Sequence, residues 1–281
     1  MYRGGNSSGF TIIEVMIFLV VTSAIFISAI NAIQGRQQVV QFQLATRETN
    51  SKLTDIFTQV ANGFYPNDDN VTCSAPIAGG PPTFTAAPPP NGKGSSDGCV
   101  FLGKVVKFKN NSANYDVISV AARRYTPGAT IDTSSFAEAL PTAVTSGGVN
   151  INDNITFQNG IQVSCVSIGP NCTLSPTSAG AIAFFGSFPN AAGNGVFASG
   201  AQHVRIGILP NVLLTDDLNT TYNQITALKT SVANFLDQPE GVVVCLVDPG
   251  TTRRVKISLG GISGQLSSTM DVLTTTDISC P

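Results

Sequence analysis

Residues 10–33 read FTIIEVMIFLVVTSAIFISAINAI, an apolar run in which Glu14 is the only charged residue. At about 1.5 Å per residue, a helix of this length covers roughly 36 Å, enough to cross the hydrocarbon core of a bilayer. A secretory signal has an apolar region of only about 7–15 residues that ends in a small-residue cleavage site. Residues 34–38 read QGRQQ instead. The segment therefore predicts a membrane-spanning helix.

Glu14 is the feature that a simple membrane anchor does not explain. A carboxylate at the centre of a membrane helix costs on the order of 2.5–3.5 kcal/mol. Glu14 lies four residues after Phe10, near one end of the span, where the cost is smaller and the side chain can reach the interface. We expect a positively charged group at the same depth to compensate this carboxylate.

The residues around Glu14 match a known processing motif. Residues 9–15, Gly-Phe-Thr-Ile-Ile-Glu-Val, resemble the cleavage site of type IV prepilins and type II secretion pseudopilins. The resemblance implies that a prepilin peptidase cleaves after Gly9 and methylates the new amino-terminal Phe10, and that Glu14 serves in assembly. The amine of Phe10 in one subunit would then neutralise Glu14 of a neighbour. The chain departs from many members in two ways: Arg3 is the leader's only basic residue, and no proline interrupts the stem.

The resemblance also implies a function, a location and partners. The chain would be a structural subunit, a minor pilin by its large head, that polymerises with other pilin or pseudopilin subunits. Its further partners would be the prepilin peptidase, the inner-membrane assembly platform and, before assembly, the lipid bilayer. The precursor would cross the cytoplasmic membrane once with its head outside the cytoplasm, and then enter an extracellular pilus or a periplasmic pseudopilus. A membrane-anchored surface protein that never polymerises is the alternative.

Apolar residues continue at helical spacing beyond the membrane-spanning part, and Gly63 followed by Pro66 predicts the end of the helix. The residues at this spacing are Phe42, Ala45, Thr49, Leu53, Ile56, Phe57, Val60 and Phe64. We predict one helix from Phe10 to about Asn62, with residues 1–9 as the leader and 34–65 as the amphipathic second half of the stem. Two helices separated by a break at Gly35 are the alternative.

Residues 66–281 read as a β-rich head. Runs rich in Val, Ile and Phe alternate with Gly, Asn and Pro, which favours antiparallel sheet over βαβ units. The predicted strands are 100–108, 115–124, 155–168, 179–188, 204–209, 242–247 and 253–259. Residues 215–237 keep helical spacing, with Thr215 as candidate N-cap. The predicted fold class is α+β, a long amino-terminal helix packed on an antiparallel sheet.

The carboxyl-terminal part of the head contains a hairpin signal. Pro249-Gly250 suits the two centre positions of a type II turn between the predicted strands 242–247 and 253–259. With Gly260-Gly261 after it, this hairpin resembles the corresponding part of pseudopilin H-like minor pilins, over about the last forty residues.

Six cysteines, an even number in a chain that otherwise reads as exported, indicate disulfides, and sequential pairing is the favoured one of fifteen. They are Cys73, Cys99, Cys165, Cys172, Cys245 and Cys280. A bond between the first two would close the base of residues 74–98, which are rich in Pro, Gly and Ser and predict a disordered-looking surface loop. An interdomain linker is the alternative there. Zinc is disfavoured, because the chain has no C-x-x-C pair and one histidine, His203.

The charged residues point to no catalytic site. With a single histidine, no G-x-S-x-G and no P-loop, the sequence predicts a non-enzyme without cofactor or metal. Asp68 and Asp69, flanked by asparagines, could offer oxygens to Ca²⁺, but the loop-glycine and distal Glu pattern is missing, so a solvated turn is favoured.

The net charge of −2 gives no global attraction to nucleic acid. Arg253, Arg254 and Lys256 in one predicted strand could contact DNA in a minor pilin at a filament tip. Further basic spots are Lys104, Lys107, Lys109, Arg123 and Arg124. Ordinary charges that keep edge strands from aggregating are the favoured explanation of all of them, so DNA is a possible but not a favoured partner.

Overall fold

The computed structural model describes residues 11–63, 71–76, 79–86, 98–110, 112–128, 133–146, 149–150, 152–168, 172, 179–186, 204–231, 235–237, 241–260, 267–273 and 280. The chain divides into two compact units, Met1–Leu44 and Ala45–Pro281. Gly9, Phe10, Asp68, Asp69 and His203 lie outside the described residues.

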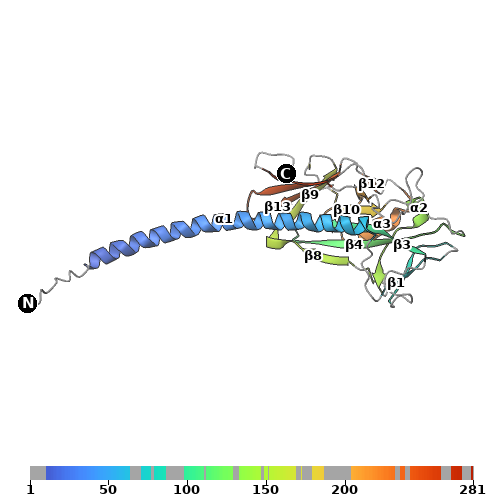
Figure 1. The fold of residues 1–281 in the computed structure, drawn as a ribbon, viewed down its shortest axis with the longest axis horizontal. Coiled ribbons are helices and arrows are strands. Elements are labelled where there is room, and N and C mark those ends of the chain that lie inside the picture. Colours follow the sequence, from blue (N-terminus) through green and yellow to red (C-terminus); the bar gives the residue numbers. More distant parts are fainter. Residues whose placement is uncertain are drawn as a thin grey trace, which may run out of the picture. The chain divides into compact units, whose positions relative to one another are not determined.

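Helix α1 spans Ile12–Ala61 as one helix of 50 residues, the blue ribbon of Figure 1. It continues through residue 35, so the alternative of a break at Gly35 is wrong. After the helix, the Gly63 N–H donates to the carbonyl of Val60 at 3.0 Å, and Gly63 adopts a left-handed φ of 63°. Glycine carries no Cβ and takes up this conformation without strain, which confirms the predicted end of the helix.

A seven-stranded antiparallel sheet has the order β12-β11-β10-β3-β4-β5, with β8 beside β4 further along the same edge. Its strands are β3 (Cys99–Phe108), β4 (Asn114–Arg123), β5 (Thr142–Ala143), β8 (Asn152–Thr156), β10 (Ala181–Gly186), β11 (Val204–Ile208) and β12 (Leu236–Asp237). Figure 1 labels most of these strands within one sheet.

A four-stranded antiparallel sheet has the order β15-β14-β13-β9. Its strands are β9 (Gln162–Ile168), β13 (Val242–Val247), β14 (Arg254–Gly260) and β15 (Ser267–Leu273). Two small ribbons, β1 (Val71–Ser74) with β2 (Thr83–Ala86) and β6 (Thr145–Ser146) with β7 (Val149–Asn150), and the short helices α2 (Phe136–Ala139), η1 (Gln158–Gly160) and α3 (Leu218–Ala227) complete the described elements. The chain is therefore α+β with antiparallel sheets.

Both faces of the central strands β3, β4 and β10 of the seven-stranded sheet are buried. On one face, the rings of Phe136, Phe185 and Phe235 lie 5.2–5.8 Å apart, centroid to centroid, in a core that also contains Ile225 of α3. On the other face, Phe184 of β10 meets the ring of Phe57 edge-on at 6.4 Å. A strand buried on both faces is mostly apolar on both, which explains why β3 shows no regular alternation of apolar and polar residues, with Lys104 and Lys107 as its two charged residues.

The predicted strand 155–168 is wrong as a single element. It is two strands, β8 and β9, which belong to different sheets. Between them the 3₁₀ turn η1 holds Asn159 and Gly160 at left-handed φ values of 54° and 69°. Asn and Gly tolerate this conformation best, so Asn159-Gly160 was the signal that the two strands separate.

Two further predictions about strands need correction. Residues 74–98 are not wholly irregular, because β2 lies among them and pairs with β1. Strand β15 was missed, because its sequence SSTMDVL is polar at four of its first five positions and lacks the apolar pattern of a buried strand. Its pairing partner, rather than its own composition, makes it a strand.

The second helix is shorter than predicted, and its N-cap is Asp217 rather than Thr215. The Asp217 carboxylate accepts from the Thr220 N–H at 2.9 Å, and this bond is the main cause of a lowered pKa of Asp217. The turn at Pro249-Gly250 is not type II, since Gly250 lacks the positive φ that type II requires. It is closed by a bond from the Thr251 N–H to the Asp248 carbonyl at 3.0 Å.

Gly241, before β13, provides a test of the second sheet. It has a φ of 94°, and an added Cβ would lie 2.4 Å from the Leu259 carbonyl oxygen of β14. We expect Gly241→Ala to lower the free energy of unfolding by more than about 2 kcal/mol, through backbone strain and displacement of β14. The matched control is Gly128→Ala, where φ is 75° but nothing lies within 4 Å, and the loss should be about 1 kcal/mol. Equal losses in denaturant titrations would contradict the close approach.

Candidate functional site

The start of α1 carries a capping box built from Thr11 and Glu14. The Glu14 N–H donates to Thr11 Oγ1 at 3.4 Å, while the Thr11 N–H and hydroxyl donate to Glu14 Oε2 at 3.0 and 3.1 Å. This reciprocal arrangement satisfies backbone donors that the first turn of a helix leaves without partners. Glu14 therefore has a local partner within its own chain.

The helix that follows this cap has an exposed apolar surface. Residues Ile12–Ile30 have a mean hydropathy of 2.5, and none of this segment is buried among the described residues. By length and composition it is a candidate membrane anchor or signal sequence. Of the residues predicted to form a processing motif, the structure describes Thr11 to Val15, and the predicted cleavage junction, Gly9-Phe10, lies outside the described residues.

The six cysteines form three disulfides in the sequential pairing favoured from the sequence. The bonds are Cys73–Cys99, Cys165–Cys172 and Cys245–Cys280. The first joins β1 to β3, and each of the other two joins a strand of the four-stranded sheet to a residue outside it. Disulfides of this kind persist in oxidising compartments.

The basic residues proposed for DNA contact are engaged within the chain. Arg253 Nη1 lies 3.8 Å from Asp248 Oδ2, and Arg254 Nη1 donates to the Cys280 carbonyl at 2.7 Å. Lys256 is half-buried and lies opposite Asp271 in the register of β14 and β15. The carboxylate of Asp248 offsets part of the charge of Arg253, and the Cys280 carbonyl occupies one N–H donor of Arg254. Both residues therefore have less to offer a phosphate.

Three of the other basic residues do not contribute to any surface patch, because they are buried. Lys104, Lys107 and Arg123 are each less than 5% exposed. Lys104 Nζ donates to Gln59 Oε1 of α1 at 2.5 Å, and burial lowers the pKa of this lysine. Arg123 Nε donates to the Tyr125 carbonyl at 2.7 Å.

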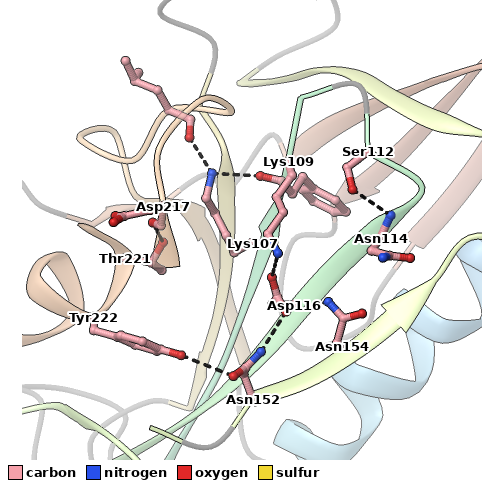
Figure 2. A network of polar contacts seen from close by, with 12 residues as sticks. Lys107, Lys109, Ser112, Asn114, Asp116, Asn152, Asn154, Asp217, Thr221 and Tyr222 are labelled. Atoms are coloured by element: carbon pink, nitrogen blue, oxygen red, sulfur yellow. Dashed lines mark hydrogen bonds and ion pairs between the residues drawn. The ribbon is translucent and has the colours of Figure 1, made fainter. Parts of the chain in front are cut away.

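Lys107 belongs to a network of polar side chains shown in Figure 2. Its Nζ donates to the carbonyls of Phe108 at 2.8 Å and Leu213 at 2.5 Å, so that β3 holds the segment before α3. Burial lowers the pKa of Lys107 to about 8, against the opposing attraction of Asp216. Desolvation disfavours the charged form of an amine, which explains the direction.

Asp116 is the centre of the second part of this network. Its carboxylate, on a residue 1% exposed, pairs with Lys109 Nζ at 2.7 Å and accepts from the amides of Asn152 and Asn154 at 2.7 and 2.8 Å. Tyr222 of α3 donates to Asn152 Oδ1 at 3.4 Å. Figure 2 shows these groups converging from β4, β8, α3 and the residue that follows β3 by one position, Lys109. Because N–H donors surround the carboxylate, this arrangement joins β8 to β4. The same donors leave the carboxylate unsuited to binding a metal cation.

Sequence reasoning missed this network, although single charged residues inside apolar strands were the available signal. Among the described residues, no group of three or more His, Cys, Asp and Glu side chains could hold a metal ion. Comparison with protein-family models, with curated proteins and with solved structures finds no match for the chain.

The shifted pKa values of Lys107 and Tyr115 predict how stability depends on pH. Lys107 has a pKa of about 8 in the folded protein and 10.5 as its ordinary value, so the unfolded chain binds more protons between these values and stability rises with pH. Burial raises the pKa of Tyr115 from 10.0 to about 12 in the folded protein. Between these values the folded chain binds more protons than the unfolded chain, so stability falls as the pH rises from 10 to 12. We expect the free energy of unfolding, measured in detergent solution, to rise from pH 8 to 10 and fall above about 10.5.

Substitutions separate the two contributions. Lys107→Met should weaken the rise, to which the buried Lys104 also contributes, and Tyr115→Phe should weaken the fall, to which Tyr222 also contributes because burial raises its pKa. A stability that is flat from pH 8 to 12 in the wild-type chain would contradict both assignments.

Removing the Asp116 carboxylate should be costly, because three donors lose their common acceptor. We expect Asp116→Ala to lower the free energy of unfolding by about 2–4 kcal/mol, since each hydrogen bond contributes about 1 kcal/mol. Asp153→Ala, at an exposed position of β8, is the matched control and should change stability by less than about 0.5 kcal/mol. Thermal unfolding of both variants would measure the difference.

Proposed function

We propose that the chain is a structural subunit of a type IV pilus-like filament or secretion pseudopilus, cleaved after Gly9 and polymerised through its amino-terminal helix. One observation carries this proposal: a carboxylate that belongs to a helix cap stands at the start of an apolar helix segment, and none of this segment is buried among the described residues. A membrane anchor needs the apolar surface, and the carboxylate serves it only as a helix cap, a role that an uncharged glutamine could also fill.

The cap explains how Glu14 is accommodated before assembly. In the lone subunit, Thr11 donates two hydrogen bonds to Glu14 Oε2. A carboxylate offers about four acceptor positions, so these bonds leave room for an ammonium group. After cleavage, the free amine of Phe10 on a neighbouring subunit would supply it and neutralise the charge inside the filament.

The described head supports the stem-and-head arrangement of such a subunit. Ala45–Ala61 belongs to the same compact unit as the sheets, and Phe57 and Gln59 of this stretch contact β10 and β3. We infer that the second half of the helix packs on the head while the first half enters lipid or the filament core. The disulfides support a head outside the cytoplasm.

A tip-located subunit that binds DNA, a second candidate, has less support. Arg253 and Arg254, which would contact phosphates, already have partners in Asp248 and the Cys280 carbonyl. A surface protein that stays in the membrane without polymerising remains the main rival, and it differs in leaving Glu14 without a role in assembly.

Processing provides the first test. The intact mass of the chain from purified filaments should lack residues 1–9 and carry one methyl group on Phe10. Gly9→Val should keep the leader, because a β-branched residue replaces the small one at the junction. Wild-type filament subunits that still carry residues 1–9 would contradict the proposal.

Two substitutions at Glu14 separate charge from capping. Gln can serve at this position of a capping box but carries no charge, whereas Ala provides neither function. We expect Glu14→Gln and Glu14→Ala both to lower filament incorporation at least about tenfold in shearing assays, equivalent to about 1.4 kcal/mol, with the head still folded. Incorporation of Glu14→Gln at the wild-type level would show that the carboxylate acts only as a cap.

A further inference from the structure

Two disulfides meet in one buried cluster on the four-stranded sheet. The cluster contains Cys165, Cys172, Cys245 and Cys280, with Val243, and each of the four cysteines is at most 1% exposed. Cys165 on β9 and Cys245 on β13 are direct cross-strand partners in the register of the sheet. Their bonds nevertheless go elsewhere, to Cys172 and Cys280.

The register places the two strand cysteines within bonding range of each other. Residues directly opposite in an antiparallel pair have Cα atoms about 4.5–5.5 Å apart. A disulfide needs a Cα separation of about 4.4–6.8 Å, and side chains of paired residues project from the same face. A direct bond between Cys165 and Cys245 would therefore fit the sheet as it stands.

We propose that these four cysteines, the exchange cluster, form a thiol–disulfide exchange site for an extracytoplasmic dithiol reductant. Reaction with the dithiol converts the two native disulfides into one Cys165–Cys245 bond and two thiols, on Cys172 and Cys280. This site goes beyond filament assembly. It requires that the head meets such a dithiol and that the structure around Cys280 opens locally, because the four sulfurs are buried in the closed state.

The exchange proceeds in three steps that balance. A thiolate of the dithiol attacks Sγ of Cys280, forms a mixed disulfide with it and releases the Cys245 thiolate. That thiolate attacks Sγ of Cys165, the Cys165–Cys245 bond forms, and Cys172 leaves as a thiolate and takes up a proton. The second thiol of the dithiol resolves the mixed disulfide and releases Cys280. In total, the dithiol is oxidised to its disulfide, and one of the two protein disulfides is reduced.

Neighbouring cations favour the thiolates that these steps need. Lys256 of β14 lies directly opposite Cys245, so Lys256, Cys245 and Cys165 form a row across three strands. Asp271 of β15, opposite Lys256, offsets part of this charge. A cation beside a cysteine stabilises its thiolate as nucleophile and as leaving group.

Arg254 keeps the products together. Its guanidinium donates to the Cys280 carbonyl at 2.7 Å, a contact that does not depend on the disulfide. The Cys280 thiol is thus retained near the cluster after exchange, and oxidation can restore the native pairing. Meanwhile the new bond joins β9 to β13, so the sheet keeps a covalent link while Cys172 and Cys280 are released.

Limited reduction of the full chain in detergent tests the proposal. The folded protein is treated with substoichiometric dithiothreitol, quenched with N-ethylmaleimide and cleaved with trypsin without further reduction. Trypsin separates the cysteines well, because fragment 125–205 contains Cys165 and Cys172, fragment 230–253 contains Cys245, and fragment 257–281 contains Cys280.

The expected product is a cross-link between fragments 125–205 and 230–253, with one alkylated cysteine in the former and an alkylated, separate fragment 257–281. Loss of native bonds only as intact pairs, with fragment 230–253 alkylated and never linked to 125–205, would overturn the proposal. The Cys73–Cys99 bond is the internal control, since neither cysteine belongs to the exchange cluster and neither should appear linked to fragments 125–205 or 230–253.

Two variants sharpen the result. In Cys172→Ser with Cys280→Ser, Cys165 and Cys245 should form a direct disulfide on oxidation, and a folded protein in which both are alkylated would overturn the geometry. Lys256→Gln should slow the exchange about threefold if it raises the thiol pKa by about one unit, because the tenfold loss of thiolate is partly offset by greater nucleophilicity. An unchanged rate would overturn the role of Lys256.

Discussion

Strands β3 and β4 are buried on both faces, so a charged side chain on them loses its water and is stabilised by a partner within the protein. A buried donor or acceptor without a partner costs about 1–3 kcal/mol, and a buried charge costs more. Lys107 meets this requirement through two backbone carbonyls, and Asp116 through Lys109 and two asparagines. These contacts hold the segment before α3 and the strand β8 against the sheet. The need to pair buried charges therefore also positions these two parts of the head.

The four-stranded sheet depends on covalent links as well as on its apolar residues. Two disulfides fasten Cys172 and Cys280 to strands β9 and β13, whose cysteines face each other across the strand pair. These disulfides stabilise the folded sheet because they restrict the conformations of the unfolded chain. Their proximity also makes a second pairing available. The placement of Cys165 opposite Cys245 therefore underlies both the stability of this sheet and the proposed exchange.

The amino-terminal helix combines two features that serve different states of the proposed subunit. Its apolar surface, which is not buried among the described residues, suits lipid or neighbouring subunits, whereas the cap of Thr11 and Glu14 satisfies the first turn in either setting. An exposed apolar surface of this length is stabilised when lipid or another protein shields it from water. The proposed polymerisation would provide one and would also give the carboxylate a charged partner.

The sequence by itself determined what depends on local periodicity and composition: one long helix, predicted from Phe10 to about Asn62 and observed over Ile12–Ala61, most of the longer strands of the head, and the cysteines as disulfide partners. It misjudged β15 and the N-cap of α3, where pairing or one hydrogen bond decides between similar residues. Only the tertiary structure decided that Lys107 contacts Leu213, 106 residues away, and that Cys165 faces Cys245. Strand register brings such residues together, and register is set by the packing of the whole sheet and not by any local stretch of chain.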